Sequence, residues 1–240
     1  MNSDTTRKDI IIEECYEPLL SIPNDGRVLL TCPHPYEVLW APYNGVSPFL
    51  LRKTVLASLL QVAKILDDRN PGYRLKIFDA YRPLAVQEFM VNYIATEYAK
   101  KVYSIPLSEA PDAIRQLSIA HACQLFAYPD SSPLSPPPHS TGAAMDLTII
   151  DEKDQEIPTW GKIDELTTAH PNTYLEAKSR TEEIYHKNRL LLSEVMQAWG
   201  FIQLEHEWWH FSQGDQNAIY LEAKRKGETA GTARYGRVDL

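Results

Sequence analysis

Cysteine is scarce in this 240-residue sequence. The three cysteines, Cys15, Cys32 and Cys123, lie far apart, form no Cys-x-x-Cys pair and leave at least one thiol unpaired. This pattern argues against a disulfide-stapled extracellular domain and against a zinc site built from thiolates. We therefore expect reduced thiols, as in a cytoplasmic protein.

Long apolar runs are also missing. No stretch approaches the ~20 residues that a helix needs to span a bilayer, so no membrane partner is expected. The N-terminal segment "MNSDTTRKDIIIEECYEPLL" has no basic start followed by a long apolar core, because Glu13 and Glu14 interrupt it. A signal peptide is therefore not predicted, and we expect a cytoplasmic location.

Basic residues are in the minority. The chain has 24 Lys and Arg against 32 Asp and Glu, a net charge of −8, and its cations form no stripe with interleaved aromatic residues. A nucleic-acid partner is therefore not expected. The composition, 44% hydrophobic and 23% charged, is typical of a globular protein. We expect a single domain over residues 1–240, with a charged, glycine-bearing tail at 222–240 that is only partly ordered.

Hydrophobic periodicity changes along the chain between the helical and the extended kind, which indicates an α+β fold. Apolar residues at helical spacing predict helices over residues 54–68, 84–101, 109–123 and 181–199. Alternating or aromatic-rich segments predict strands over residues 73–80, 143–150 and 201–211. Thr181 is expected to cap the last helix, and Gly200 is expected to end it.

The stretch "PPPHSTGAAMDLTII", residues 136–150, places a histidine on a proline-rich loop seven residues before an aspartate. In the segment that follows, Met145, Leu147 and Ile149 alternate with polar residues. This alternation predicts a half-buried strand whose polar face carries Asp146. His139 and Asp146 are therefore candidate ligands of one metal ion.

The stretch "EHEWWHF", residues 205–211, allows two interpretations. His206, Glu207 and His210 match His-Glu-x-x-His, a zinc motif that needs a helix, because only there do residues four apart share a face. The adjacent Trp208 and Trp209 favour a strand instead. In that case His210 is a ligand and Glu207 is the base. The chain then has to bend at Trp208–Trp209, since residues three apart in a regular strand face opposite ways.

His139, Asp146 and His210 together form a set of ligands that suits catalytic zinc. Three protein ligands leave the fourth position of zinc open for water. One carboxylate and two neutral imidazoles leave Zn²⁺ with a net charge of about +1, which favours a bound hydroxide near neutral pH and polarises a carbonyl. We therefore expect one Zn²⁺ per chain as the cofactor.

The stretch "FDAYRP", residues 78–83, places an arginine between the end of a predicted strand and the helix that Pro83 begins. Junctions of this kind line active sites. A fixed guanidinium at such a place stabilises the oxyanion of a tetrahedral intermediate, so Arg82 is a candidate catalytic residue.

The segments "DAYRP", "HSTGAAMDLT" and "EWWHF", in this order, resemble the D-alanyl-D-alanine dipeptidases of the vancomycin-resistance (VanX) type. These enzymes belong to a zinc peptidase superfamily that includes D,D-carboxypeptidases and the hedgehog signalling domain. The resemblance extends from about residue 15 to residue 213. It implies an α+β domain in which a small antiparallel sheet, flanked by helices, carries the zinc site.

The resemblance also implies a role for each candidate residue. It makes Glu207 the general base and acid, Arg82 the residue that steadies the transition state, and three residues the zinc ligands: His139, Asp146 and His210. In "GKIDEL", Asp164 matches an aspartate that holds the free amine of the substrate, with Ile163 where the family often has Phe. The family usually has Ser before the first ligand histidine, where this chain has Pro138. This difference lies at the end of the site that is implied to bind the substrate amine.

The expected function is zinc-dependent hydrolysis of a small D,D-dipeptide, D-Ala-D-Ala, to two molecules of D-alanine. One alternative is a D,D-carboxypeptidase or peptidoglycan peptidase on the same zinc site, which would need an exposed cleft. Another is a non-catalytic zinc-binding module. The module would need neither Glu207 nor Arg82, and a structural zinc would normally have its fourth position filled.

Overall fold

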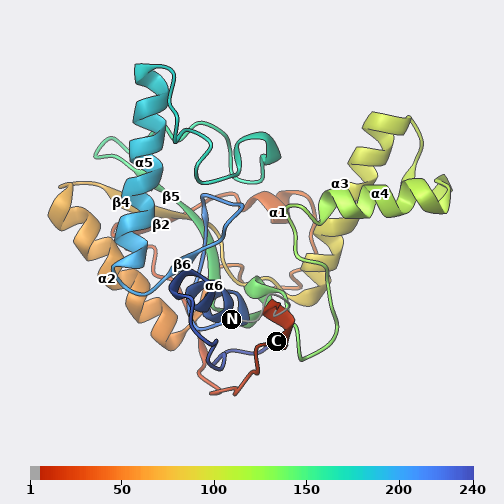
Figure 1. Ribbon diagram of the computed structural model, residues 1–240, viewed down its shortest axis with the longest axis horizontal. Helices are drawn as coiled ribbons and strands as arrows, with labels where there is room; N and C mark the ends of the chain where they lie inside the picture. Colours follow the sequence, from red (N-terminus) through yellow and green to blue (C-terminus); the bar gives the residue numbers. More distant parts are fainter. Residues whose placement is uncertain (1–5) are drawn as a thin grey trace.

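A computed structural model describes residues 6–240 and shows an α+β chain built around a five-stranded sheet (Figure 1). Residues 1–5, the first residues of the N-terminal segment for which no signal peptide is predicted, lie outside the described residues. The strand order is β2-β4-β5-β7-β6, and every neighbouring pair is antiparallel except the parallel β2 and β4. The strands of this sheet are β2 (Val28–Leu30), β4 (Arg74–Asp79), β5 (Ala144–Ile150), β6 (Ile202–Gln203) and β7 (His210–Ser212). A separate antiparallel pair consists of β1 (Leu19–Ser21) and β3 (Leu50–Arg52).

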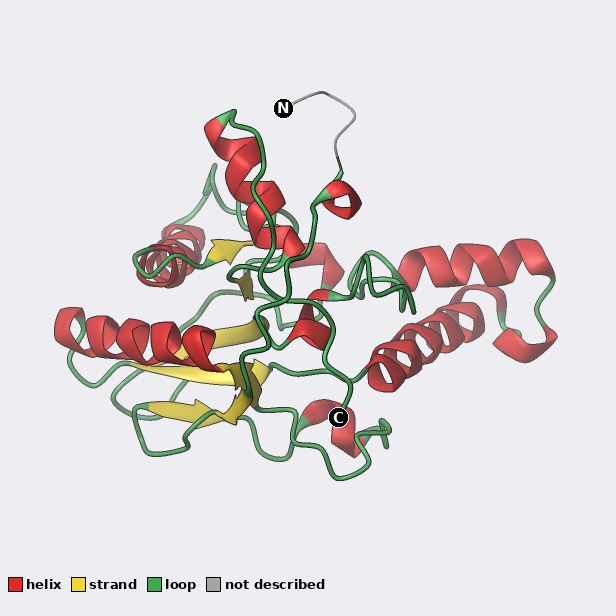
Figure 2. Ribbon diagram, turned by 90° about the horizontal axis from the view of Figure 1, so that it is seen from below, coloured by secondary structure: helices red, strands yellow, loops and turns green. Residues whose placement is uncertain are grey.

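Helices surround the sheet and extend from it. The α-helices are α1 (Pro35–Val38), α2 (Lys53–Arg69), α3 (Leu84–Tyr103), α4 (Asp112–Ala122), α5 (Arg180–Gln197) and α6 (Gln216–Lys226). Four short 3₁₀ helices are η1 (Arg7–Asp9), η2 (Leu107–Glu109), η3 (Pro138–Thr141) and η4 (Leu166–Thr168). Helices α3 and α4 form a hairpin that projects away from the rest of the chain (Figure 2).

The main hydrophobic core lies between the sheet and helices α2 and α5. On α2, four residues at helical spacing are fully buried: Val55, Leu59, Val62 and Leu66. They pack in one cluster with Leu75 and Ile77, the two residues that share a face of β4. A second, smaller core joins the base of the α3–α4 hairpin to the α1 segment through Tyr36, Val86 and Phe126. The two cores meet around β4, whose end carries the candidate site.

The main periodic elements predicted from the sequence are confirmed, with three differences. The cap of α5 is Ser179, whose hydroxyl accepts a hydrogen bond from the Glu182 amide at 3.2 Å, so the prediction for Thr181 was wrong. Strand β5 is buried on both faces rather than on one: Met145, Leu147 and Ile149 belong to the main core, and Asp146 and Thr148 on the other face are buried as well. Residues 201–211 form β6, a turn and the start of β7 rather than one strand.

The C-terminal segment 222–240 is the one for which the composition predicts only partial order. Helix α6 continues to Lys226, and the segment after it returns to the body of the protein. Tyr235 is buried, and Ala233 pairs with Ile12 in a short parallel bridge. The amide of Val238 donates to the carbonyl of Ser140 at 2.9 Å, next to the candidate metal ligand on that loop. Backbone pairing and burial of an aromatic ring therefore hold a segment that its composition alone suggested was loose.

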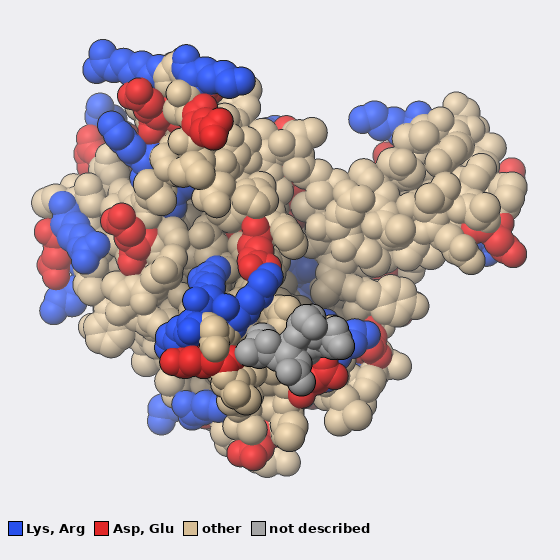
Figure 3. All heavy atoms as spheres, in the orientation of Figure 1, with Lys and Arg blue, Asp and Glu red and all other residues tan. Residues whose placement is uncertain are grey.

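Two surface properties bear on possible partners. On the face drawn in Figure 3, lysine and arginine side chains are interspersed with aspartates and glutamates, as on an ordinary solvated surface. Within residues 6–240, no helix is long and apolar enough to cross a membrane.

Candidate active site

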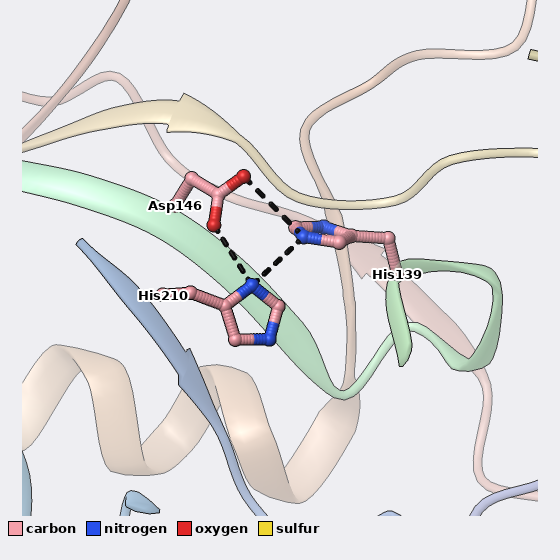
Figure 4. A group of neighbouring side chains, drawn as sticks. All are labelled: His139, Asp146 and His210. Carbon is pink, nitrogen blue, oxygen red and sulfur yellow. Dashed lines mark hydrogen bonds and ion pairs between the residues drawn. The ribbon is translucent and has the colours of Figure 1, made fainter. Parts of the chain in front are cut away.

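Three elements that are distant in sequence bring the predicted metal ligands together (Figure 4). His139 lies in η3, and Asp146 and His210 are directly paired residues of the neighbouring strands β5 and β7. The Nδ1 atom of His210 lies 2.9 Å from Asp146 Oδ1 and 3.1 Å from His139 Nε2. His139 Nε2 lies 3.3 Å from Asp146 Oδ2. All three side chains are buried, and each offers a ligand atom to one small volume.

The chemistry of this cluster fits a divalent metal ion. Ligand atoms of a tetrahedral zinc site, with bonds of about 2.0–2.2 Å, lie about 3.3–3.6 Å apart, close to the separations found here. His139 Nδ1 donates to the carbonyl of Ala80 at 2.7 Å, so the lone pair of its Nε2 faces the cluster, as in metal-binding histidines. Although burial opposes it, the imidazoles of His139 and His210 lower the pKa of Asp146, which keeps this carboxyl ionised.

Glu207 lies beside the cluster on the turn before β7. Its Oε2 atom is 3.9 Å from Nδ1 of His210, and the side chain is buried. The chain bends at Trp208–Trp209, as predicted, and both indole rings are buried there. Residues 201–211, all within the described part of the chain, form no helix, so the helical zinc motif is wrong. Burial raises the pKa of the Glu207 carboxyl, as suits a group that accepts and returns a proton.

Arg82 is held rigidly next to the same cluster. Its Nε and Nη2 atoms donate to Oδ2 of Asp79 at 3.0 and 2.7 Å, and its Nη1 donates to Gln87 Oε1 at 2.9 Å. Nη2 also lies 3.6 Å from Oδ2 of Asp146. The guanidinium is therefore fixed, buried and adjacent to the site where the three candidate ligands meet.

Sequence reasoning missed the residues that hold Arg82. Asp79 is fully buried. Its Oδ1 atom accepts a hydrogen bond from the Tyr43 hydroxyl at 3.1 Å and lies 3.1 Å from Nε2 of His34. No spacing in the sequence links His34 to the candidate metal ligands. Asp79 did carry a signal, since it stands three residues before Arg82 in "FDAYRP" and faces the buried side of β4.

Asp164 reaches the site from the long loop between β5 and α5. Tyr36 Oη donates to its Oδ2 at 2.7 Å. Burial, together with the charge of Asp146, raises the pKa of Asp164 to about 7. The backbone at Asp164 is left-handed, with φ of 68°, a conformation that aspartate adopts more readily than most residues other than glycine. In this conformation the loop presents the carboxyl to the cavity.

The six predicted residues line one small cavity. Its volume is about 170 Å³, below the roughly 300–1,000 Å³ of sites for drug-sized ligands. The cavity is lined by the candidate ligands, base, arginine and amine-binding residue, namely Arg82, His139, Asp146, Asp164, Glu207 and His210. Leu125 and Phe126, from the base of the α3–α4 hairpin, form an apolar wall. The space suits a substrate no larger than a small peptide.

Arg189 of α5 organises the loop that carries Asp164. Its guanidinium donates to four backbone carbonyls, at 2.6 to 3.0 Å: those of Thr159, Trp160, Thr168 and His170. It also lies over the ring of Trp208, 5.2 Å from the centroid. Gly161 closes the same loop with φ of 87°, where a Cβ would come within 1.8 Å of the Thr168 hydroxyl. One buried cation therefore ties the Asp164 loop to the residue after Glu207.

Replacing Arg189 by methionine is expected to destabilise the protein by about 2–4 kcal/mol, because buried carbonyls lose their donors while the apolar volume is kept. For a chain of this size we expect the Tm to fall by about 5–15 °C, measured by differential scanning calorimetry. Arg180→Met, at an exposed position on the same helix, is the matched control and should leave Tm nearly unchanged. Equal Tm values for the two variants would contradict the role given to Arg189.

Comparison with known proteins defines the class. The profile of a peptidase family described as D-Ala-D-Ala dipeptidase matches residues 30–226. The D-alanyl-D-alanine dipeptidase of Synechocystis sp. (strain ATCC 27184 / PCC 6803 / Kazusa) is 38% identical over 250 residues, covering 100% of both chains. The D-alanyl-D-alanine dipeptidase of Escherichia coli (strain K12) is 26% identical over 158 residues, covering 66% of this chain and 62% of that protein. The protein is therefore a peptidase. It belongs to the D-Ala-D-Ala dipeptidase family, and the predicted resemblance is confirmed.

Two solved structures are similar to this chain at lower sequence identity. The LdcB LD-carboxypeptidase has a TM-score of 0.46 and 18% sequence identity, covering 90% of this chain and 77% of that chain. VanYB in complex with D-alanine-D-alanine has a TM-score of 0.42 and 17% identity, covering 75% of this chain and 79% of that chain. The assignment to the family rests on the sequence matches.

Proposed function

We propose that residues 1–240 form a single zinc-dependent dipeptidase domain that hydrolyses D-Ala-D-Ala to two molecules of D-alanine. One observation carries the proposal: a buried glutamate, Glu207, lies beside a cluster of two imidazoles and a carboxylate in a cavity of about 170 Å³. The names of the relatives from Synechocystis and Escherichia coli support the same substrate.

One zinc ion would be held by His139 Nε2, a carboxylate oxygen of Asp146 and His210 Nδ1. These are the three atoms that converge, and the ionised carboxyl of Asp146 supplies the negative charge that a dication needs. When bound, zinc supplies a Lewis acid that polarises the scissile carbonyl and lowers the pKa of water.

Glu207 would serve as general base and then as general acid. Its carboxyl lies at the edge of the cluster rather than within it, so it is free to remove a proton from the attacking water. The same proton then passes to the nitrogen of the leaving D-alanine. Burial raises the pKa of Glu207 toward neutral pH, where one carboxyl can both take a proton from water and give it to the leaving nitrogen.

Arg82 would stabilise the negative charge that develops on the carbonyl oxygen. Asp79 and Gln87 already fix its guanidinium, so no side chain has to reorganise during the reaction. Although Asp79 balances part of its charge, the Nη2 atom still faces the cluster, 3.6 Å from Asp146. This geometry favours a role in the transition state over a purely structural ion pair.

Asp164 would receive the ammonium group of the dipeptide. It is a half-buried carboxyl on the cavity wall, and the hydroxyl of Tyr36 fixes one of its oxygens. The small cavity would exclude an extension at the amine end, so the site favours a free dipeptide over a longer chain. Pro138, which replaces the usual Ser of the family, also lines this cavity.

Affinity for the dipeptide is expected to fall once the pH drops below the pKa of Asp164. Burial and the charge of Asp146 raise this pKa, a bound zinc ion would lower it, and the neutral carboxyl cannot pair with an ammonium group. We expect the Kd of D-Ala-D-Ala to rise about tenfold per pH unit below that pKa, where binding must displace a proton. The optimum should lie just below pH ~8, where the amine begins to lose its own proton.

Calorimetric titration of zinc-loaded Glu207→Gln protein measures this dependence without turnover and without titration of the base. The double variant that adds Asp164→Asn is the control. It should bind more weakly and lose the acid dependence. If the double variant kept the same loss of affinity at acid pH, a group other than Asp164 would be responsible.

The substrate assignment is tested by release of free D-alanine from D-Ala-D-Ala and from its N-acetylated form. We expect the zinc-loaded protein to cleave only the free dipeptide. Cleavage of the blocked form would indicate a D,D-carboxypeptidase on the same site. Zinc binding without cleavage of either compound would contradict the proposed reaction and favour a non-catalytic zinc-binding module.

A further inference from the structure

A second arginine lines the cavity and has no part in the reaction described above. Arg7 lies in η1, close to the N-terminus and outside the part of the chain that the family profile matches. It borders the same cavity as His139, Asp164 and Glu207. Its side chain is half-buried, and burial lowers its pKa although nearby carboxylates oppose the shift. A partly desolvated cation at the wall of a substrate cavity is a candidate for binding an anion.

The charge of Arg7 is not used by an ion pair within residues 6–240. No carboxylate among these residues lies within 4.0 Å of it, whereas Arg82 pairs closely with Asp79. The two carboxylates whose charges act on the pKa of Arg7, Asp130 and Asp215, have other partners. Asp130 faces Lys8 at 3.5 Å. Asp215 caps α6. Its Oδ1 atom accepts hydrogen bonds from the Ser212 hydroxyl and the Ala218 amide, both at 2.8 Å.

Other polar side chains line the cavity, including Gln124, His206 and Asn217, but none of them carries the permanent positive charge of an arginine. Pro137 and Pro138 precede His139, and proline has no backbone N–H. Pro138 itself lines the cavity. Of the two arginines that line the cavity, Arg82 pairs with Asp79, so Arg7 is the one whose charge can pair with a bound carboxylate.

The segment that carries Arg7 is anchored to the site. Gln216, in the first turn of α6, is buried and donates from Nε2 to the carbonyls of Ile10 and Leu134 at 2.7 and 2.9 Å. Further along, the amide of Glu13 donates to the carbonyl of Ala233 at 2.8 Å. These contacts fix η1 against α6, which follows β7 and its ligand His210.

We propose that Arg7 binds the free C-terminal carboxylate of the substrate. This inference rests on the proposed function, because a dipeptide is a zwitterion with one charge at each end. Asp164 would take the ammonium group and Arg7 the carboxylate, so that opposite charges of the cavity hold the two ends of the substrate. The planar guanidinium matches a carboxylate with two parallel donors. The arginine would thus make the enzyme selective for an unmodified C-terminus.

The test compares two substrates, D-Ala-D-Ala and D-alanyl-D-alaninamide, in which a neutral carboxamide replaces the carboxylate. We expect the wild type to prefer the free acid. Arg7→Gln should lower kcat/KM for the free acid by about 10- to 100-fold, mainly through KM, and leave the amide nearly unaffected. Arg7→Lys should fall between, since it keeps the charge but loses the paired donors. Lys8→Gln, a neighbour in the same η1 turn, should behave as wild type.

Three outcomes would overturn the inference. If Arg7→Gln kept the wild-type preference for the free acid, the carboxylate would be bound elsewhere. Equal losses on both substrates would show that Arg7 supports the fold or the reaction in general, and Tm and zinc content would separate these two causes. If the wild type cleaved the free dipeptide but showed no preference over the amide, the carboxylate would not be recognised, although the proposed dipeptidase activity would stand.

Discussion

Glu207→Ala is expected to lower kcat by about 10²–10⁴-fold while the protein keeps its zinc. General acid–base catalysis by a positioned side chain contributes a factor of this size. Zinc should stay, because the converging ligand atoms belong to His139, Asp146 and His210, and the Glu207 carboxyl lies 3.9 Å from the nearest of them. Burial raises the pKa of the Glu207 carboxyl, which means that burying its charge costs free energy of folding. Removing this carboxyl should therefore not destabilise the fold.

The measurement is kcat for D-alanine release together with zinc per chain by mass spectrometry. Glu205→Ala is the matched control: it changes a carboxylate on the same turn that pairs with Lys224 at the surface, at 2.9 Å. That control should keep both activity and metal. Substantial activity in Glu207→Ala would remove the residue from the base role, and loss of zinc would make it a ligand instead.

His210→Ala is expected to lose the metal and, with it, all turnover. Zinc sites with four protein ligands are worth roughly 10–16 kcal/mol, or about 3–4 kcal/mol per ligand, so removing one of three ligands should weaken binding by about 10²–10³-fold. Asp146 and His139 remain 3.3 Å apart but present only two ligand atoms. The affinity can be measured by competition with a chromophoric chelator.

His206→Ala provides the control for this second variant. His206 stands four residues earlier on the same turn but is exposed, and it is not among the three residues whose ligand atoms converge. We expect His206→Ala to bind zinc as the wild type does. A wild-type zinc affinity in His210→Ala would refute the ligand assignment, and a loss of zinc in His206→Ala would show that the site includes a residue the geometry leaves out.

The spacing of residues was enough to predict which side chains the structure brings together, because two of the three candidate ligands lie in or next to patterned strands. Asp146 lies in an alternating strand. Glu207 and His210 flank Trp208 and Trp209, two large apolar residues that indicate a buried segment, and both indole rings are buried in the structure. The required bend at Trp208–Trp209 followed from the two-residue period of a strand. Asp164 was reached only through resemblance, since a carboxyl on an irregular loop has no periodic signal.

Contacts between distant segments could not be predicted in the same way. The buried carboxyl of Asp79 gathers Arg82, His34 and Tyr43, of which two come from an irregular segment about forty residues earlier in the chain. Strands of two or three residues, such as β1 and β6, are too short for alternation to appear. Burial of both faces of β5 likewise depends on the segments that pack over the sheet rather than on the sequence of the strand itself.

The central claim is that a metal ion at His139, Asp146 and His210 makes this chain a D,D-dipeptidase. The most direct test is release of D-alanine from D-Ala-D-Ala by protein stripped of metal with a chelator and then titrated with Zn²⁺. We predict no turnover by the stripped protein and activity that rises linearly until one zinc is bound per chain. Full activity in protein shown to contain no metal would contradict the claim.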